Sequence, residues 1–559
     1  MSGLVKWRFC LIIFLMLTAT GYTLIRYGLH IVQDNPSRAG QPQTAVERGR
    51  ILDRNGKVLA SETGTSRDYP EKKLAAQIIG FTGNGNIGRE GIEYAFNKEL
   101  SEGSDVFLTI DVNVQHILEQ VAASTLSRTR AESVMILAMD PRDGDILGSA
   151  VLPGFDPNDY NALSSRIYHN PAATSSYEPG SVFKIFSIAA LMDAGVISEY
   201  SEFTCNGVYE RTFSSGEKIR IECADRVAHG RVRPREIIIQ SCNVGAALAA
   251  ERLENQTFYE LMLRFGFGNK TGAWVNSSTA EPPLMETAGL LKNPRIPGLW
   301  WGRTRQSIAF GQEIAVSALQ IMQAASVIAH NGIMVPPKIV SRVVSAAGKT
   351  VINGENSNIR RQVLSAETAR KMVSYMENTA SLAGTGWRAD PGDIRIAVKT
   401  GTSQLRDPST RRIDPATGRI VEYSETDFIA SCIALLPANS PSLVLYVVVI
   451  KPRGEILGGR IAAPVIREAA DALINYLGIP RERNPIVEHS GRIDLVEKTL
   501  PAIGTRVPDF SGLSKRTLLP LLNRSDIRVE LFGEGWVRRQ APPPGTPITP
   551  GMLIELELE

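Results

Sequence analysis

Three short motifs carry hydroxyl, amine and amide groups that together could transfer an acyl group. In the first, Ser181 and Lys184 stand three residues apart at the start of the apolar run 185–192, which predicts a helix. Side chains at this spacing share one helix face, so the two would lie one turn apart. A serine hydroxyl becomes a nucleophile when a base removes its proton, and a lysine can be that base if burial lowers its pKa. Alone, Ser-x-x-Lys also recurs by chance as a solvated helix pair.

The second motif, Ser241-Cys242-Asn243, follows an apolar run at 237–239. The Ser241 hydroxyl could relay a proton and the Asn243 amide could orient a substrate in the same cleft. The Cys242 side chain between them is expected to point away from that cleft. The alternative interpretation is a helix cap, a position that Ser and Asn favour.

The third motif, Lys399-Thr400-Gly401-Thr402, comes at the end of the alternating segment 394–398. The alternation predicts a strand with its apolar side chains on one face and Lys399 on the other. Lys399 supplies a cation for a terminal carboxylate, and the two threonines supply hydroxyl donors. Gly401 would leave room for a substrate backbone beside the strand. The alternative is an exposed lysine at a strand end.

The order Ser-x-x-Lys, Ser-x-Asn, Lys-Thr-Gly is typical of β-lactamases and penicillin-binding proteins. Over nearly its whole length the chain resembles class B penicillin-binding proteins, which are monofunctional peptidoglycan D,D-transpeptidases. The segments that carry the resemblance, besides the motifs, are 48–56, 88–93, 108–111, 177–181, 384–386 and 458–464.

The resemblance implies a reaction and a role for each motif residue. Ser181 would attack the penultimate D-alanine carbonyl of a stem pentapeptide and expel the terminal D-alanine, with Lys184 as the base. Ser241 would shuttle the proton to the leaving amine, and Asn243 would complete the site. Backbone amides of Ser181 and Thr402 would form the oxyanion hole. An amine of a neighbouring stem would take the acyl group, and β-lactams would acylate the same serine. The substrate carboxylate would be held by Lys399, Thr400 and Thr402, and Gly401 would belong to the same substrate-binding segment.

The elements that must position these motifs predict an α+β domain over residues 131–480. Runs at 134–139, 428–436 and 443–450 predict buried strands, and helical patterns fill most of the interval between them. A sheet assembled from both ends of a segment, with helices between, is an α+β arrangement. The resemblance implies the penicillin-binding/β-lactamase-like transpeptidase fold, a central antiparallel sheet flanked by helices.

The N-terminal region predicts a membrane anchor and a small pedestal. Lys6 and Arg8 precede an uncharged run, which suggests a cytoplasmic tail at 1–8 and a transmembrane signal anchor at 9–28. A cleaved signal peptide and a buried soluble helix are the alternatives. Residues 29–130 would form the pedestal (dimerisation-like) domain, opened by a hairpin at Asn55-Gly56. The pedestal is expected to be compact, because only residues 61–68 stand where the family carries a larger segment.

The C-terminal region predicts a linker at 481–505 and a separate small domain at 506–559. Segments 507–513 and 540–545 resemble a PASTA domain. Such domains are associated with binding peptidoglycan or β-lactams, and a purely structural appendix is the alternative.

Charge and cysteine content exclude several other classes. The net charge is only +3 and no block of like charges appears, so no nucleic-acid partner is expected. Five cysteines in 559 residues are too few for a disulfide scaffold. Cys205 and Cys223 could pair in an oxidising compartment or remain free thiols. The other cysteines and the scattered histidines suggest no metal set, and no cofactor is expected.

The resemblance further implies a role, a location and partners. We expect septum synthesis in cell division, with the catalytic domain outside the bacterial cytoplasmic (inner) membrane in a single-pass arrangement. A polytopic SEDS-type glycosyltransferase and divisome proteins are the expected partners. A carboxypeptidase or β-lactamase would share the motifs, and a non-catalytic β-lactam- or peptidoglycan-binding scaffold is the alternative from another class. The absence of a glycosyltransferase domain before the body speaks against a bifunctional class A enzyme, and the short N-terminal tail against a sensor.

Overall fold

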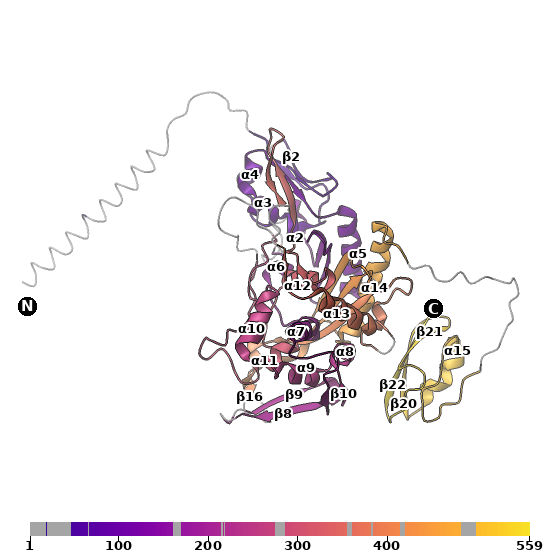
Figure 1. Cartoon of the computed structure of the whole chain (residues 1–559). Coiled ribbons are helices and arrows are strands. Elements are labelled where there is room, and N and C mark those ends of the chain that lie inside the picture. The colour runs from indigo at the N-terminus through magenta and orange to yellow at the C-terminus, as the bar shows by residue number, and fades with distance from the viewer. Residues whose placement is uncertain are drawn as a thin grey trace, which may run out of the picture. The chain divides into compact units, whose positions relative to one another are not determined.

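The structure is a computed structural model (Figure 1). It describes Thr18 and residues 46–559, apart from gaps at 65, 160–168, 214–215, 217, 274–285, 355–359, 382–383, 414–419 and 482–498. The anchor expected over 9–28 therefore lies outside the described residues except for Thr18, and so does most of the linker. Within the described part of the chain, no helix is both long and apolar enough to cross a membrane.

A five-stranded antiparallel sheet forms the centre of the body. Its strand order is β15-β18-β19-β5-β6, so the two ends of the segment meet between β19 and β5. This confirms the predicted strands and the α+β fold. The strands are β5 (Ser133–Met139), β6 (Ile146–Leu152), β15 (Ala397–Arg406), β18 (Tyr423–Leu436) and β19 (Leu443–Ile450).

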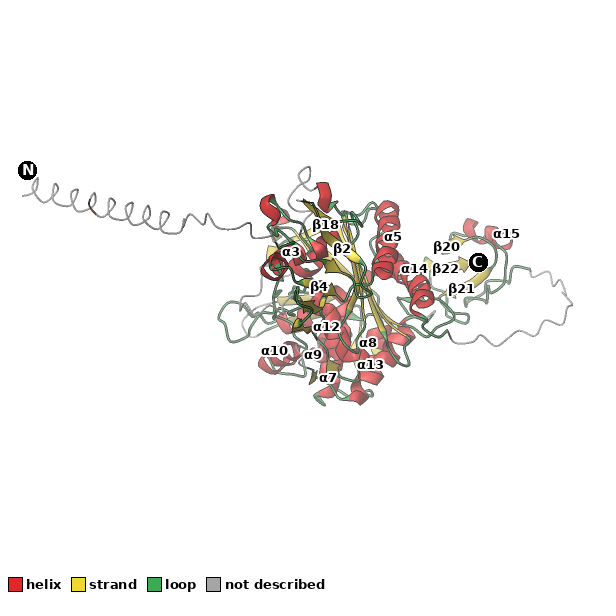
Figure 2. Cartoon of the chain, turned by 90° about the horizontal axis from the view of Figure 1, so that it is seen from above, coloured by secondary structure: helices red, strands yellow, loops and turns green. Residues whose placement is uncertain are grey.

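Helices cover both faces of this sheet (Figure 2). Along β5, alternate side chains enter two different cores, which explains why the whole strand reads as apolar. Val134, Ile136 and Ala138 pack with α5 (Val112–Thr129) and α14 (Gly458–Leu477). The other face carries most of the remaining helices: α6 (Pro171–Thr174), α7 (Lys184–Asp193), α8 (Pro234–Ile239), α9 (Asn243–Ala250), α10 (Asn255–Arg264), α11 (Thr304–Ala309), α12 (Ala318–Ala329) and α13 (Ala366–Thr379).

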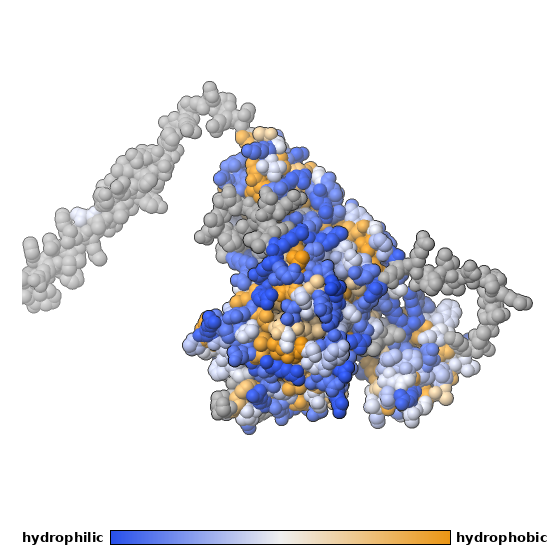
Figure 3. Space-filling model, viewed as in Figure 1, coloured by the Kyte–Doolittle hydropathy of each residue, from blue (hydrophilic) through white to orange (hydrophobic). Residues whose placement is uncertain are grey.

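The body also contains short two-stranded sheets that are separate from its central sheet. They are β7 (Phe203–Cys205) with β10 (Gly230–Val232), β8 (Val208–Thr212) with β9 (Lys218–Glu222), β11 (Ile333–Met334) with β14 (Arg361–Gln362), and β16 (Arg412–Ile413) with β17 (Ile420–Val421). On the face shown in Figure 3, apolar side chains gather in the central part of the body among polar ones.

The pedestal sheet takes strands from two distant parts of the chain. Its order is β13-β12-β4-β1-β2-β3, and β12 pairs with β4. Both β12 (Val340–Val344) and β13 (Thr350–Asn353) fall inside the range 131–480 that we expected to belong wholly to the body. The pedestal is therefore not built from residues 29–130 alone. Its other elements are β1 (Ile51–Leu52), β2 (Val58–Thr63), β3 (Ser66–Asp68), α2 (Ala76–Ile79), α3 (Gly91–Ala95), α4 (Asn97–Ser101) and β4 (Asp105–Leu108).

The predicted hairpin at Asn55-Gly56 is confirmed. It joins β1 to β2, which pair antiparallel, and Gly56 adopts a φ of +88° that favours glycine. The Asp53 carboxylate accepts hydrogen bonds from the backbone N–H groups of Asn55, Lys57 and Val112. One side chain thus shapes the hairpin and ties it to the first turn of α5. β2 and β3 pair antiparallel within residues 61–68, the short segment on which the expectation of a compact pedestal rests.

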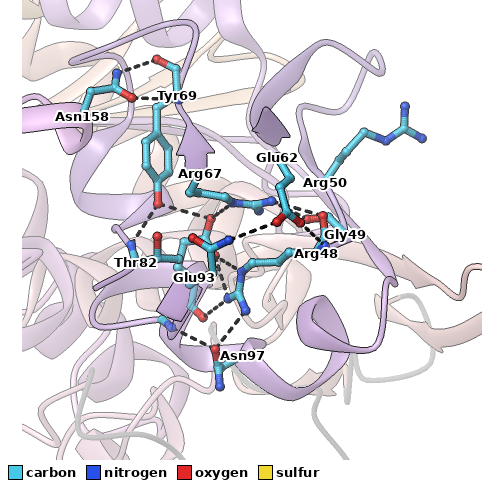
Figure 4. Close-up of polar contacts among 12 residues, drawn as sticks. Arg48, Gly49, Arg50, Glu62, Arg67, Tyr69, Thr82, Glu93, Asn97 and Asn158 are labelled. Atoms are coloured by element: carbon cyan, nitrogen blue, oxygen red, sulfur yellow. Dashed lines mark hydrogen bonds and ion pairs between the residues drawn. The ribbon is translucent and has the colours of Figure 1, made fainter. Parts of the chain in front are cut away.

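A buried carboxylate holds the pedestal core together (Figure 4). Glu93 is fully buried and accepts ion-paired hydrogen bonds from Arg48 at 2.7 Å and from Arg67 at 2.6 Å. Tyr69 also reaches its Oε1, at 3.4 Å, and accepts a bond from the Thr82 N–H. These contacts join β3, α3 and the segment before β1. They give a structural role to Arg48 and Glu93, which lie in segments 48–56 and 88–93, two of the segments that carry the family resemblance.

The C-terminal unit folds around its own small core. Three strands, β20 (Ile527–Gly533), β22 (Met552–Leu558) and β21 (Val537–Ala541), form a sheet in that order beside α15 (Lys515–Leu518). Phe510, Leu518 and Ile554 are fully buried between them. The expected small domain of short strands and turns is confirmed.

We expect Glu93→Gln to destabilise the pedestal by about 3–5 kcal/mol, because it leaves two buried guanidinium groups without their carboxylate. Hydrogen–deuterium exchange of peptides from β1 to β4 would measure the change in opening free energy. The control is Glu367→Gln, which removes an exposed pair with Lys371 and should leave the exchange of these peptides unchanged. An equal change in this opening free energy in the two variants would contradict the expectation that the buried ion pairs of Glu93 stabilise the pedestal.

Candidate active site

The nucleophile motif lies at the junction of two helical turns. Residues Gly180–Phe183 form a 3-10 turn that leads directly into α7, so Ser181 and Lys184 face each other across the junction. Gly180 adopts a φ of +56°, and a Cβ there would come within 2.6 Å of the Thr402 carbonyl oxygen. Glycine thus permits this turn to pack directly against β15.

Lys184 Nζ is surrounded by oxygen atoms. It lies 2.6 Å from Ser181 Oγ, 2.9 Å from the Ser241 carbonyl oxygen and 2.6 Å from Asn243 Oδ1. A neutral amine has two N–H groups and one lone pair. If the N–H groups donate to the Ser241 carbonyl and to Asn243, the lone pair is left to accept the proton of Ser181. The three contacts therefore suit a general base.

Burial favours the neutral form of this amine. Lys184 is fully buried, and burial lowers its pKa to about 8, although the nearby Cys242 and Cys223 act in the opposite direction. Lys399 is also fully buried, and burial together with the positive charge of Lys184 lowers its pKa well below the usual range. No ion pair joins either amine to a carboxylate among the residues that the structure describes.

Ser241 connects the two lysines. Its Oγ lies 3.3 Å from Lys184 Nζ and accepts a hydrogen bond from Lys399 Nζ at 3.0 Å. The residue sits in the turn between α8 and α9 with a φ of +58°, a conformation that is uncommon for serine. The Asn243 amide N–H donates to the Glu222 carbonyl at 2.8 Å, which anchors this turn to β9. Neither Ser241 nor Asn243 makes the capping bond; Cys242 Sγ caps α9 instead, and as expected it points away from the cleft.

The third motif lies inside a strand and not at its end. β15 begins at Ala397 and continues to Arg406, at one edge of the central sheet. Lys399 is buried, which excludes the exposed strand-end alternative. Thr400 Oγ1 lies 2.8 Å from Thr385 Oγ1, and Thr402 Oγ1 accepts a hydrogen bond from the Gly458 N–H at 2.9 Å.

Gly401 has a different neighbour from the one we expected. A Cβ at this position would come within 2.5 Å of Ser431 Oγ and 2.9 Å of the Pro179 carbonyl oxygen. The space beside Gly401 is therefore filled by β18 and by the turn that carries the nucleophile, not left for a substrate backbone. Glycine is needed here because the turn approaches the strand so closely.

The structure brings all the predicted site residues to one place. Ser181, Lys184, Ser241, Asn243 and Lys399 are connected by the contacts above. Thr400, Gly401 and Thr402 line the same cleft as Ser181, Ser241 and Asn243. Thr385 and Gly458 also line it and bind the threonines of the third motif, a role that the sequence did not indicate.

Glu178 is a positioning residue that the sequence alone did not single out. Its Oε1 accepts hydrogen bonds from the Glu313 N–H at 2.9 Å and from the Tyr423 hydroxyl at 2.8 Å. Its backbone carbonyl accepts one from Ser403 Oγ at 2.7 Å. Burial raises the pKa of Glu178 to about 7. These bonds tie the chain just before Ser181 to β15 and β18.

Comparison with known proteins identifies the family of this chain. The family described as "Penicillin binding protein transpeptidase domain" matches residues 134–471, and "PASTA domain" matches residues 505–559. The chain belongs to the penicillin-binding transpeptidase family. Membership confirms the expected family, and the second match confirms the resemblance of the tail.

Individual relatives of this transpeptidase are known in sequence and in structure. The chain is 28% identical to "Stage V sporulation protein D" of Bacillus subtilis, over 91% of this chain and 78% of the relative. It is 27% identical to "Probable peptidoglycan D,D-transpeptidase FtsI" of Caulobacter vibrioides, over 78% and 71%. The crystal structure of penicillin binding protein 3 of Mycobacterium tuberculosis, complexed with ampicillin, superposes with a TM-score of 0.67 at 25% identity, over 79% of this chain and 98% of that chain.

We expect the acylation of this transpeptidase by a β-lactam to rise with pH and level off. Below the pKa of about 8, Lys184 is an ammonium and cannot accept the serine proton. The rate constant should therefore rise about tenfold per pH unit and reach a plateau above that pKa. Stopped-flow measurement with a fluorescent penicillin would give the profile.

The control for this profile is Lys184→Arg. A guanidinium stays charged throughout the range, so this variant should acylate about 10²- to 10⁴-fold more slowly, without the rise. A flat profile in the unaltered protein would contradict the assignment of Lys184 as the base.

Proposed function

We propose that this protein is a serine-type D,D-transpeptidase that cross-links peptidoglycan stem peptides through an acyl-enzyme on Ser181. The observation that carries the proposal is the 2.6 Å contact between Ser181 Oγ and a buried Lys184 whose N–H groups have their own acceptors. A scaffold that only bound peptidoglycan would gain nothing from burying a lysine against a serine in this way.

In the first half-reaction, Lys184 takes the Ser181 proton as Oγ attacks the penultimate D-alanine carbonyl. The backbone N–H groups of Ser181 and Thr402 would stabilise the oxyanion. Collapse of the tetrahedral intermediate breaks the peptide bond and leaves an ester on Oγ. Ser241 Oγ lies between the two lysines, so it passes the proton from Lys184 to the amine of the departing D-alanine.

In the second half-reaction, an amine from a neighbouring stem peptide attacks the ester. Its proton returns through the same groups and Ser181 is released as a hydroxyl. The net change is the exchange of one peptide bond for another, so no cofactor or oxidant is required. The stem carboxylate would be held by Lys399 with the hydroxyls of Thr400 and Thr402, and would supply the negative charge that this buried amine lacks.

β-Lactams would act as substrate mimics, because their strained amide presents a carbonyl and a carboxylate at the spacing of a D-alanyl-D-alanine end. The related penicillin binding protein 3 of Mycobacterium tuberculosis forms a complex with ampicillin. The same cleft in this chain would hold a β-lactam as an ester of Ser181.

The cellular setting is part of the proposal. The charged residues before the apolar run support an anchor at 9–28, a single pass through the cytoplasmic membrane and catalysis on its outer side. A role in septum synthesis is supported by the likeness to a protein named FtsI. A polytopic SEDS-type glycosyltransferase and divisome proteins would be the partners. The C-terminal domain would bind peptidoglycan.

We expect Ser181→Ala to abolish covalent labelling by penicillin and release of D-alanine from a pentapeptide. Mass spectrometry of peptides from the unaltered protein should place the adduct on Ser181. The control is Ser101→Ala, an exposed serine at the end of α4, which should label normally. Labelling that persists in Ser181→Ala would refute the assignment of the nucleophile.

The anchor has its own test. The full-length chain should stay with the membrane fraction during alkaline carbonate extraction, whereas a chain that begins at residue 29 should be released. An equal distribution of the two would argue that residues 9–28 do not span the bilayer.

A further inference from the structure

Three cysteines and a histidine meet directly behind the second catalytic motif. Cys205 ends β7, Cys223 follows β9, His229 precedes β10, and Cys242 lies between Ser241 and Asn243. One sulfur or nitrogen atom from each lies within 4.8 Å of all the others. The three thiols are buried and free, and the imidazole is half-buried. In the sequence, Cys205 and Cys223 were a possible disulfide pair, and Cys242 and His229 showed no relation to them.

Three of the six distances between the four donor atoms are close to the edges of a zinc tetrahedron, and none of the six exceeds 4.8 Å. Sulfur ligands about 2.3 Å from a tetrahedral zinc stand about 3.8 Å apart, and a sulfur–nitrogen edge is about 3.6 Å. Here Cys205 Sγ lies 3.6 Å from Cys223 Sγ, and Cys223 Sγ lies 3.8 Å from Cys242 Sγ. Cys205 Sγ is 3.4 Å from Nδ1 of His229.

A disulfide explains this cluster less well. Bonded sulfurs are about 2.05 Å apart, so either cysteine pair would have to close by more than about 1.5 Å. Cys223 is equally placed for both partners, and either pairing would leave one thiol and the histidine without a role. A single ion, by contrast, uses all four groups.

The surroundings favour thiolates. The Gly245 N–H donates to Cys242 Sγ at 3.2 Å, and the Gly207 N–H donates to Cys205 Sγ at 3.4 Å. Hydrogen bonds of this kind support metal-bound sulfur. Cys223 and His229 line the active-site cleft, which gives an ion a way in.

We propose that Cys205, Cys223, His229 and Cys242 bind one zinc ion. Three thiolates and one imidazole complete a tetrahedron without a water ligand, which is the pattern of a structural site. The ion would not touch the substrate. It would fix the turn that carries Ser241 and Asn243 to the hairpin of β8 and β9, because Cys242 is the residue between those two side chains.

Zinc binding is thus linked to the position of Asn243 Oδ1, which accepts a hydrogen bond from Lys184 Nζ at 2.6 Å. The zinc ligands are positioning residues in this scheme.

The test is the zinc content of the full-length protein, purified in detergent under reducing conditions. Inductively coupled plasma mass spectrometry should find about one zinc per chain. Cys205→Ala and His229→Ala should lose most of it. The matched controls Cys432→Ala and His116→Ala, which alter a cysteine and a histidine outside the cluster, should keep it.

Two further variants separate a lost ligand from a lost fold and from a lost reaction. His229→Cys should restore zinc binding, because a fourth thiolate can replace the imidazole. Ser181→Ala should retain full zinc although it cannot be acylated, so the result does not depend on the proposed reaction. Cobalt in place of zinc should give the visible absorption of a tetrahedral thiolate site.

Some results would overturn the proposal. Absence of zinc from protein produced in zinc-supplemented cells is one. Retention of zinc in both Cys205→Ala and His229→Ala is another. A disulfide among Cys205, Cys223 and Cys242 in freshly isolated protein, found by non-reducing peptide mapping, would assign the cluster to thiol oxidation instead.

Discussion

Lys184 Nζ can accept the proton of Ser181 Oγ only when the amine is neutral, with two N–H groups and a free lone pair. Much of the surrounding structure keeps the amine in that form. Water would restore the charge, so the amine must be buried. Burial of a lysine is costly unless its N–H groups have acceptors. Asn243 and the Ser241 carbonyl are those acceptors, and they come from a turn some sixty residues further along the chain. The packing of α7 against α9 follows from the same demand.

Whether a feature of the fold or the site could be predicted from the sequence depends on how far apart in the chain the interacting residues lie. The strand at 134–139 and the hairpin at Asn55-Gly56 were predictable, because an apolar run and a turn dipeptide are local signals. The catalytic motifs were predictable because their spacing and order are distinctive. The capture of β12 and β13 by the pedestal sheet was not, because strand pairing between residues 105–108 and 340–344 leaves no local pattern.

The misplaced or missed site features share a cause. Gly401 was read as space for substrate, but the space is filled by a turn that arrives from residue 179. Cys242 carried no metal signal because its three companions lie on other elements, between 13 and 37 residues away. Glu178 looked like part of a motif, and only the fold places it between Glu313 and Tyr423. In each case the decisive neighbour was distant in sequence and close in space.

The shared pedestal sheet has a consequence for how the protein can be divided. A fragment that began at residue 131 would keep β12 but lose β4, its partner. The row of N–H and C=O groups along β12 would then be exposed, together with Val340 and Val343, which are now buried. Such an edge recruits any strand it meets, including that of a second copy. We therefore expect the catalytic body to stay soluble only when it is produced together with the pedestal strands.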